Sequence, residues 1–333
     1  MILRRENASL LPFNTFGIDV TARELIEYDS EQELRQLAPL ESFLHVGEGS
    51  NLLFTRPYDG TVLHSRICFT EVLGESADGS VAVRVGAGVM WDDLVAWAVV
   101  SGLSGIENLS LIPGEVGAAA VQNIGAYGVE LKDVVTAVNT VDMHTGLPRR
   151  FTREECGYGY RDSVFKRPGM KRYAVTSVEL ELSRTYRPVT AYRALTDYME
   201  QTGLEPSPEA VRRAVIHLRR GKLPEPAKLG NAGSFFTNPV VSVDKARELA
   251  SQWPGMPEYP ADGGVKLSAG WLIDRAGWKG RSMGRAGVYE RQALVLVNLG
   301  GASGSEIVRL ANAVVASVRE QFGVTLTPEV NIF

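Results

Sequence analysis

Three short segments of this 333-residue sequence carry side chains suited to proton transfer or charge stabilisation. Ser234 stands among small residues and beside two phenylalanines, so its hydroxyl could act as a positioned proton donor. Arg161 follows a Gly-Tyr-Gly-Tyr run, and its planar fork suits a carboxylate or a diphosphate. Glu329 lies among apolar residues near the chain end, where a strand could hold it inward in protonated form. Taken singly, each has an ordinary alternative: a serine turn or cap, a surface ion pair, and an exposed carboxylate.

The sequence disfavours a serine hydrolase and a metalloenzyme. A serine hydroxyl is a weak nucleophile until a base activates it, and no histidine lies in the segment around Ser234. That segment also lacks the GxSxG elbow. The four histidines are scattered, and Cys68 and Cys156 form no CxxC, so no metal site is expected.

Two glycine-rich segments in the first half predict a pyrophosphate site. One spans residues 47–53 after a short β-prone run, and the other runs from 112 to 120 and continues over 123–128. Glycine lets successive backbone N–H groups face an anion without a side chain in the way. Neither segment fits a Rossmann fingerprint, because the third glycine and the long following helix are missing. The pair Gly86 and Gly88 fits an ordinary turn as well as a ligand site.

The bulk composition indicates a cytoplasmic globular protein. Hydrophobic residues make up 44% and charged residues 22% of the chain, and its length favours two or three domains. A net charge of −4 provides no general basic field for nucleic acid. No apolar run reaches the roughly 18 residues that cross a bilayer, and the N-terminus lacks the apolar core of a signal peptide. Two cysteines without disulfide spacing fit a reducing cytoplasm.

The first half is predicted to hold mostly short strands that end at glycines or turns. A turn is expected at 58–60 and a helix at 91–100. Alternating apolar residues predict strands at 42–46, 61–65, 81–85, 136–143 and 173–182.

The second half is predicted to carry longer helices. Ser207 and Pro208 favour a helix start, and Gly221 is expected to end that helix. Ser303 and Glu306 form a capping box for a helix that Gly323 should close. The linker after the first helix divides the chain near residue 222, and the sum is an α+β protein. Four arginines on the first helix could hold a diphosphate or form a solvated face: Arg212, Arg213, Arg219 and Arg220.

Taken together, the segments resemble the UDP-N-acetylenolpyruvoylglucosamine reductase family over nearly the whole chain. The matches follow the family's order from Asn14 to Val330. The run PVTAYRALTDY resembles the longer form of the family, in which a loop tyrosine closes over the substrate. The matching stretches are NTFGI, VGEGSNLLF, LIPGEVGAAAVQNIGAYG, GYGYRDSVFK, KLPEP, GNAGSFFTNP, VKLSAGWLID and LTPEV.

This resemblance implies a fold and its division into domains. An FAD-binding fold of the vanillyl-alcohol-oxidase type should be followed by a C-terminal α+β substrate-binding domain. The first FAD subdomain would span 1–66, completed by 323–333, and the second would span 67–222. The substrate domain would span 223–322.

The resemblance also implies an activity. The chain would reduce UDP-N-acetylglucosamine enolpyruvate to UDP-N-acetylmuramate, with NADPH as co-substrate and non-covalent FAD, in peptidoglycan precursor synthesis. It would act as a monomer on a small UDP-sugar, without nucleic acid or membrane insertion. Ser234 would be the proton donor, and Arg161 and Glu329 the substrate polarisers.

Binding residues follow from the same matches. FAD would be held by Gly47, Glu48, Gly49, Ser50, Asn51, Leu52, Ile112, Pro113, Gly114, Gly117, Ala118, Asn123, Gly125, Ala126, Tyr127 and Gly128. The substrate would be held by Tyr160, Tyr192, Lys222, Asn238, Tyr259, Lys266 and Gln292. Glu115 departs from the small or neutral residue expected in the flavin loop, and Asn331 stands where the family often has a basic residue.

Two rival hypotheses remain at this level. A flavin oxidase of the same fold would often tether its flavin through a histidine in the first glycine segment, and residues 47–55 contain none. A non-catalytic UDP-sugar-binding module would not need serine, arginine and glutamate together. Use of NADPH separates the reductase from the first rival, and a bound flavin separates it from the second.

Overall fold

The computed structural model describes residues 1–333, which group into two units. Unit 1 comprises residues 1–8, 22–48 and 59–219. Unit 2 comprises residues 9–21, 49–58 and 220–333. The chain therefore passes between the units several times, and its last crossing lies close to the predicted boundary at 222.

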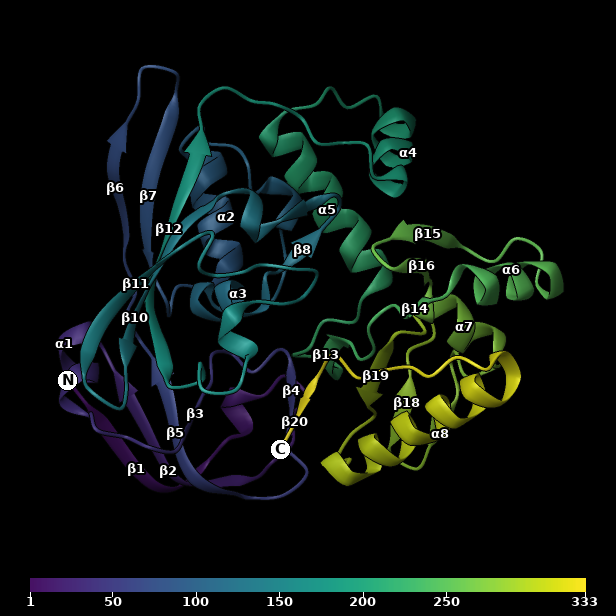
Figure 1. Cartoon of the computed structure of the whole chain (residues 1–333), viewed down its shortest axis with the longest axis horizontal. Helices are drawn as coiled ribbons and strands as arrows, with labels where there is room; N and C mark the ends of the chain where they lie inside the picture. Colours follow the sequence, from purple (N-terminus) through teal and green to yellow (C-terminus); the bar gives the residue numbers. More distant parts are fainter. The chain divides into compact units, whose positions relative to one another are not determined.

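A five-stranded antiparallel sheet forms the centre of unit 1 (Figure 1). Val81, Val83 and Val85 are fully buried at every second position of β7, which is the period that covers one face of a strand. The helices α2 (Trp91–Val100) and α3 (Val116–Gln122) pack in the same hydrophobic core. In spatial order the strands are β11 (Leu147–Thr152), β10 (Val135–Asp142), β12 (Tyr173–Ser183), β7 (Ser80–Gly86) and β6 (Thr70–Glu75).

A second, four-stranded sheet of unit 1 carries the N-terminal part of the chain. Its core includes Tyr28, Leu34 and Leu63, with Leu34 supplied by α1 (Glu31–Gln36). The strands lie in the order β1 (Leu3–Ser9), β2 (Thr21–Tyr28), β5 (Tyr58–Ser65) and β3 (Phe43–His45), and β3 runs parallel to β5.

Two amphipathic helices complete unit 1. They are α4 (Arg193–Thr202) and α5 (Pro208–Lys222), and their apolar faces meet around Leu195, Val211 and Val215. Tyr127, in the turn between β8 (Gly125–Ala126) and β9 (Val129–Glu130), packs against the same cluster. This contact joins the second glycine-rich segment to the helices.

Unit 2 builds its core from two small sheets and three helices. The long helix α8 (Gly304–Phe322) places Ile307, Leu310 and Val314 in the core. The other helices are α6 (Val243–Gln252) and α7 (Ala269–Arg275). One sheet has the order β13 (Gly230–Ser234), β19 (Val295–Asn298), β18 (Ala286–Val288) and β17 (Ser282–Met283), and the other β14 (Val240–Val241), β16 (Gly264–Leu267) and β15 (Glu258–Ala261).

The chain end returns to an early segment within unit 2. The strand β20 (Asn331–Ile332) runs parallel to β4 (Leu52–Leu53). The first glycine-rich segment therefore leads directly into the strand that holds the C-terminus, which places Glu329 two residues before that pairing.

Most predicted helix ends are confirmed. The Oγ of Ser207 accepts from the N–H of Ala210 at 3.1 Å, and Ser303 and Glu306 form the predicted capping box. Gly323 closes α8 in the left-handed conformation. The predicted stop at Gly221 is wrong, because α5 continues to Lys222 and a single glycine within a helix costs only about 1 kcal/mol.

The predicted turn at 58–60 is also wrong. Residues 58–60 begin β5, and Asp59 and Gly60 do not adopt the positive φ of a hairpin turn. The sheet partners of β5 determine the backbone here in place of the local turn preference.

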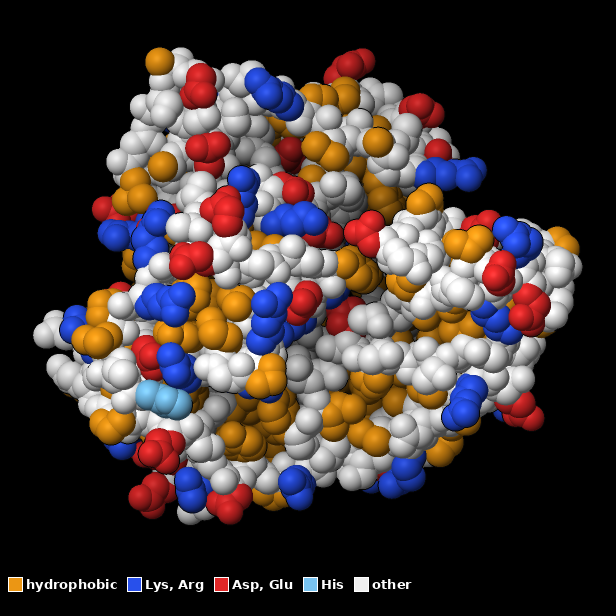
Figure 2. All heavy atoms as spheres, viewed as in Figure 1, with side chains coloured by type: hydrophobic (Ala, Val, Ile, Leu, Met, Phe, Trp, Pro, Cys, Tyr) orange, Lys and Arg blue, Asp and Glu red, His pale blue; other side chains and the backbone are white.

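Charged side chains are mixed over the face drawn in Figure 2. Lysine and arginine side chains alternate with aspartate and glutamate, in keeping with a net charge of −4. None of the helices combines the length and the apolar character that a membrane span requires.

Candidate active site

Ser234 is the last residue of β13 and follows an irregularity in the pairing with β19. Asn231 pairs with Val297 and Ser234 with Val295, so two residues of β13 lie opposite one of β19. Gly233 has φ +67°, and its N–H donates to the side-chain oxygen of Asn231 at 2.9 Å. A bulge of this kind redirects the next side chain, and Ser234 is left partly exposed.

Glu329 lies beside the same strand end in unit 2. Its N–H donates to the carbonyl of Phe235 at 2.8 Å, and Phe236 bridges to Pro328. The structure thus places the backbone of Glu329 against Phe235, the residue that follows Ser234, although 95 positions of sequence separate Ser234 from Glu329.

Asn331 joins the C-terminal segment to the first glycine-rich segment. Its backbone N–H and its side-chain amide both donate to the carbonyl of Asn51, each at 3.1 Å. The side chain of Asn51 in turn donates to the carbonyl of Glu329 at 3.5 Å. Asparagine at 331 therefore fixes the backbone around Glu329 to the first glycine-rich segment by hydrogen bonds in place of charge.

Arg161 belongs to unit 1 and sits in a tight turn. Gly159 and Asp162 exchange backbone hydrogen bonds of 3.0 and 3.1 Å, and Arg161 between them has φ +54°. Its Nη2 donates to the carbonyl of Gly125 at 2.7 Å. A Cβ at Gly125 would lie 3.2 Å from Nη1 of Arg161, so glycine at this position leaves room for the guanidinium.

The second glycine-rich segment is fixed by close backbone packing. A Cβ on Gly117 would lie 2.9 Å from the Cβ of Ala87, so α3 can approach β7 only with glycine there. Asn123 closes α3 at φ +47°, and its side chain donates to Glu130 at 2.9 Å and to the carbonyl of Gly159 at 2.8 Å. Asn123 therefore joins the glycine-rich segment to the turn that bears Arg161.

The loop that opens this segment is held by Asp92, which the sequence did not single out, and by two of the four α5 arginines. Leu111 has φ +58°, and its N–H donates to Asp92 Oδ1 at 2.5 Å. Arg212 donates to both oxygens of Asp92, at 2.6 and 3.0 Å. Arg219 donates to the carbonyl of Leu111 at 3.2 Å. Two of the four α5 arginines thus hold the loop, whereas Arg213 and Arg220 face solvent.

The two glycine-rich segments are linked within unit 1. Glu48 Oε2 accepts from the N–H of Gly114 at 2.6 Å. In unit 2 the first segment makes a second close approach, because a Cβ on Gly49 would lie 1.9 Å from the carbonyl oxygen of Phe13. Gly49 has φ +74°, so both its conformation and its packing require glycine.

Glu115 is a buried acid between these segments. Burial first, and the charge of Glu48 second, raise the pKa of Glu115 to about 8. The Nδ1 of His64 lies 3.8 Å from Glu115, and burial lowers the pKa of His64. Both groups are therefore neutral at pH 7. Glu115 is thus an uncharged residue in this loop because its carboxyl is protonated.

A pH-dependent stability follows from this position. The folded pKa of Glu115 lies above its unfolded value of 4.5, so its neutral form contributes stability at low pH that is lost as pH rises toward 8. Glu115→Gln should melt close to the parent at pH 5 and above it at pH 8.5, by on the order of 1–2 kcal/mol. Thermal melts with Glu200→Gln, an exposed glutamate of α4, as control would check this; equal gains at both pH values would contradict it.

The substrate candidates occupy several elements of the structure. Tyr192 is half exposed at the N-cap of α4, and Lys222 ends α5. In unit 2, Tyr259 on β15 lies opposite Lys266 on β16. The remaining candidates are Tyr160, which is exposed beside Arg161; Asn238, whose oxygen accepts from the N–H of Ala269 at 2.9 Å; and Gln292, whose oxygen accepts from the N–H of Leu294 at 3.4 Å.

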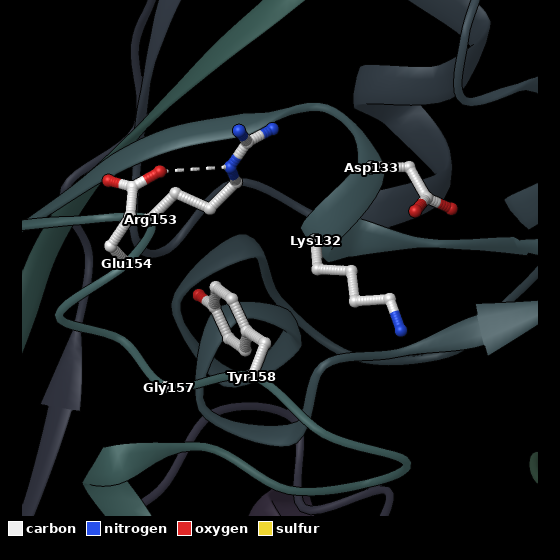
Figure 3. Close-up of a pocket in the computed structure, with 6 residues that line it drawn as sticks. All are labelled: Lys132, Asp133, Arg153, Glu154, Gly157 and Tyr158. Carbon is white, nitrogen blue, oxygen red and sulfur yellow. Dashed lines mark hydrogen bonds and ion pairs between the residues drawn. The ribbon is translucent and has the colours of Figure 1, made fainter.

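An open hollow of about 530 Å³ lies elsewhere on unit 1 (Figure 3). It contains none of the candidate residues, although its lining residues Gly157 and Tyr158 lie three and two positions before Tyr160. Its lining has two basic and two acidic side chains, so it favours neither an anionic nor a cationic ligand. The lining residues are Lys132, Asp133, Arg153, Glu154, Gly157 and Tyr158.

The residues of unit 1 suit a dinucleotide. The glycines bring backbone close to backbone with no side chain between, and Arg219 carries a positive charge beside Leu111 with no carboxylate within ion-pair distance. An anion such as a diphosphate would neutralise that guanidinium. The donor set therefore fits the phosphates of a flavin dinucleotide.

Comparison with protein-family models matches both halves of the chain. Residues 36–152 match a model described as an FAD binding domain. Residues 225–333 match a model described as UDP-N-acetylenolpyruvoylglucosamine reductase, C-terminal domain. The matched ranges contain Ser234, Glu329 and the whole of both glycine-rich segments.

Full-length relatives carry the same name. Proteins called UDP-N-acetylenolpyruvoylglucosamine reductase from Bacteroides fragilis and Pseudomonas aeruginosa are 50% and 46% identical to this chain. They cover 97% and 99% of it, and 98% of each relative is matched.

Solved structures confirm the predicted fold class. The crystal structure of UDP-N-acetylenolpyruvylglucosamine reductase from Thermus caldophilus has a TM-score of 0.67 at 28% identity and covers 100% of this chain and 99% of its own. A 6-hydroxy-D-nicotine oxidase from Arthrobacter nicotinovorans has a TM-score of 0.50 at 15% identity over 91% of this chain and 81% of its own, and shows fold alone.

Proposed function

Because the chain belongs to the UDP-N-acetylenolpyruvoylglucosamine reductase family, we propose that it reduces UDP-N-acetylglucosamine enolpyruvate to UDP-N-acetylmuramate with NADPH. The observation that carries the proposal is 50% identity to such a reductase over 97% of the chain. It is an FAD-dependent oxidoreductase of peptidoglycan precursor synthesis.

The cofactor is FAD, bound without a covalent link. When bound, FAD would supply the hydride-transfer chemistry between NADPH and the enolpyruvyl group. The two glycine-rich segments would hold it, with Arg219 as an additional cation for its phosphates. Glu48 and Asp92 would keep the loop around Gly114 in place by accepting its backbone N–H groups.

Three side chains would then act on the substrate. Adding a hydride to the vinyl carbon places negative charge on the adjacent carbon and on the carboxylate. Arg161, and Glu329 in its protonated form, would stabilise that charge. The Oγ of Ser234 would give its proton to the carbon, which completes the conversion of an enolpyruvyl to a lactyl ether.

The UDP diphosphate is proposed to lie against Lys222, at the end of α5, and Lys266, on β16. Lys222→Ala and Lys266→Ala should each raise the KM for the enolpyruvyl sugar about tenfold, because a charge-assisted bond to phosphate is lost. Steady-state kinetics would measure this. Lys228→Ala is the matched control, because Lys228 is an exposed lysine of unit 2 that pairs with Glu225 at 2.5 Å. An unchanged KM in both test variants would remove these lysines from the site.

The activity itself is tested by product analysis. The purified protein with NADPH and the enolpyruvyl sugar should form a product two mass units heavier, with one NADPH consumed per product. UDP-N-acetylglucosamine, which lacks the enolpyruvyl group, should consume none. Oxygen uptake without any need for NADPH would instead support a flavin oxidase.

The finer assignments are proposals as well. We infer that the chain works as a monomer in the cytoplasm, and that the reductase's three-part division applies: 1–66 with 323–333, 67–222, and 223–322. The pairing of β20 with β4 supports joining the C-terminus to the first of these parts. Size-exclusion chromatography with light scattering would test the monomer.

A further inference from the structure

Asn108 is a buried amide whose two donor hydrogens both serve backbone carbonyls of other loops. Its side chain is 1% exposed. The Nδ2 donates to the carbonyl of Tyr127 at 2.9 Å and to the carbonyl of Val189 at 2.8 Å. One planar group therefore joins two loops that lie 62 residues apart in the sequence.

The orientation of this amide is fixed by those two bonds. The Oδ1 of Asn108 is buried and accepts no hydrogen bond. Rotating the amide by half a turn would bring this oxygen against the two carbonyl oxygens, which repel it. An unpaired buried acceptor is rare in proteins. Here Oδ1 of Asn108 stays unpaired while both hydrogens of Nδ2 bond to the two loops.

Asn108 itself is held firmly. It lies in a short 3-10 helix (Glu107–Leu109), and Trp91 of α2 donates to the carbonyl of Leu109 at 3.0 Å. The carboxylate of Glu107 accepts from the N–H of Gly105 at 2.7 Å. The amide therefore projects from a rigid part of the unit 1 core.

The two loops it joins are those that carry candidate ligand residues. The Tyr127 turn (residues 125–130) belongs to the proposed FAD site, and the Tyr192 segment (residues 186–192) leads to a proposed substrate residue. The rings of Tyr127 and Tyr192 meet edge to face, with centroids 5.2 Å apart. A Cβ on Gly128 would lie 3.5 Å from Val189, so backbone and side chains of the two loops are in contact.

We propose that Asn108 is a positioning residue that fastens the Tyr192 segment to the Tyr127 turn, so that the substrate tyrosine is held at a fixed place relative to the flavin loop. This rests on the proposed function for the roles of Tyr127 and Tyr192. Tyr192 is half exposed, and its segment contains no regular secondary structure. Without the amide, the segment would keep the ring contact and the bond from Thr196 to the carbonyl of Thr190, and would lose the hydrogen bond that joins Val189 to Asn108.

Limited proteolysis of the FAD-loaded protein tests the fastening without reference to activity. Arg193 directly follows Tyr192, and its side chain is 94% exposed, so trypsin can cut there. Asn108→Leu should speed cleavage after Arg193 about tenfold, because the segment opens more often. Asn139→Leu is the matched control, since Asn139 also donates twice, to Ser177 and Glu179, on β10 and away from the segment. Should Asn108→Leu not fold, Asn108→Ser, which keeps one donor, takes its place.

Kinetic measurements test whether the two hydrogen bonds of Asn108 hold Tyr192 in the position that the substrate needs. Asn108→Leu should raise the KM for the enolpyruvyl sugar about tenfold while FAD reduction by NADPH changes less than about twofold. In a Tyr192→Ala background, the same substitution should add less than about twofold, because both changes remove one function.

The two arms distinguish the possible failures. Equal rates of cleavage after Arg193 in Asn108→Leu and Asn139→Leu would show that Asn108 does not hold the Tyr192 segment. Faster cleavage with an unchanged KM, or full additivity with Tyr192→Ala, would overturn the positioning role. Absence of turnover in the parent protein would refute the proposed function and the positioning role with it, and the trypsin rates would still decide the fastening.

Discussion

Ser234→Ala is expected to bind FAD and to be reduced by NADPH as the parent is, yet to be reoxidised by the enolpyruvyl sugar about 10²–10⁴-fold more slowly. NADPH gives up only a hydride, so the first half of the cycle needs no proton from this hydroxyl. The second half leaves a carbanion-like carbon that must be protonated. Anaerobic stopped-flow absorbance separates the two halves.

Ser242→Ala is a matched control for this experiment. Ser242 caps α6 in the same unit, where its Oγ accepts from the N–H of Lys245, so its loss affects helix stability only. Near-normal reoxidation in Ser234→Ala would remove Ser234 from the mechanism. A slow first half in the same variant would indicate a damaged flavin site.

Arg161→Lys is expected to lower the rate of substrate reduction about 10²–10³-fold. Lysine keeps the positive charge, but it lacks the planar fork that reaches the carbonyl of Gly125 and that would also bind the substrate carboxylate in the proposed function. The effect should appear in the substrate half of the cycle, which pre-steady-state absorbance isolates.

Arg153→Lys controls for the loss of an arginine on the same unit. Arg153 is exposed and pairs with Glu154 at 3.4 Å, away from the glycine-rich segments. If Arg161→Lys reduces substrate at the parent rate, charge alone suffices and the guanidinium has no special role. Equal losses in Arg153→Lys would show that the effect is general.

Local chemistry determined what the sequence could predict. Ser303 with Glu306 forms a capping box because the hydrogen bonds join neighbouring residues, and the strand around Val83 follows from alternate burial. The prediction of a turn at 58–60 was wrong because sheet neighbours, which no local pattern reveals, hold that backbone extended.

The main contacts of the site could not be predicted because they join distant residues. Asp92 meets Arg212 across 120 positions, and no spacing rule on α2 or α5 indicates the partner. The same holds for Asn108, because no local pattern in the mixed polar and apolar sequence around it indicates Tyr127 or Val189 as a partner. Glycine-rich composition drew attention to both segments, but only the fold shows that Glu48 joins them through the N–H of Gly114.

Burial also determines whether an acidic side chain is charged. Glu115 looked like an unwanted negative charge in a phosphate-binding segment, yet burial and Glu48 keep it protonated near neutral pH. The residue type can be read from the sequence, whereas the burial and the nearby Glu48 that determine its charge appear only in the folded chain.

The visible absorbance of the purified protein, followed anaerobically, tests the central claim most directly. A yellow protein should lose its flavin absorbance on adding NADPH and recover it on adding the enolpyruvyl sugar, with no recovery on adding UDP-N-acetylglucosamine. A colourless protein, or a bleached flavin that the enolpyruvyl sugar does not restore, would contradict the account.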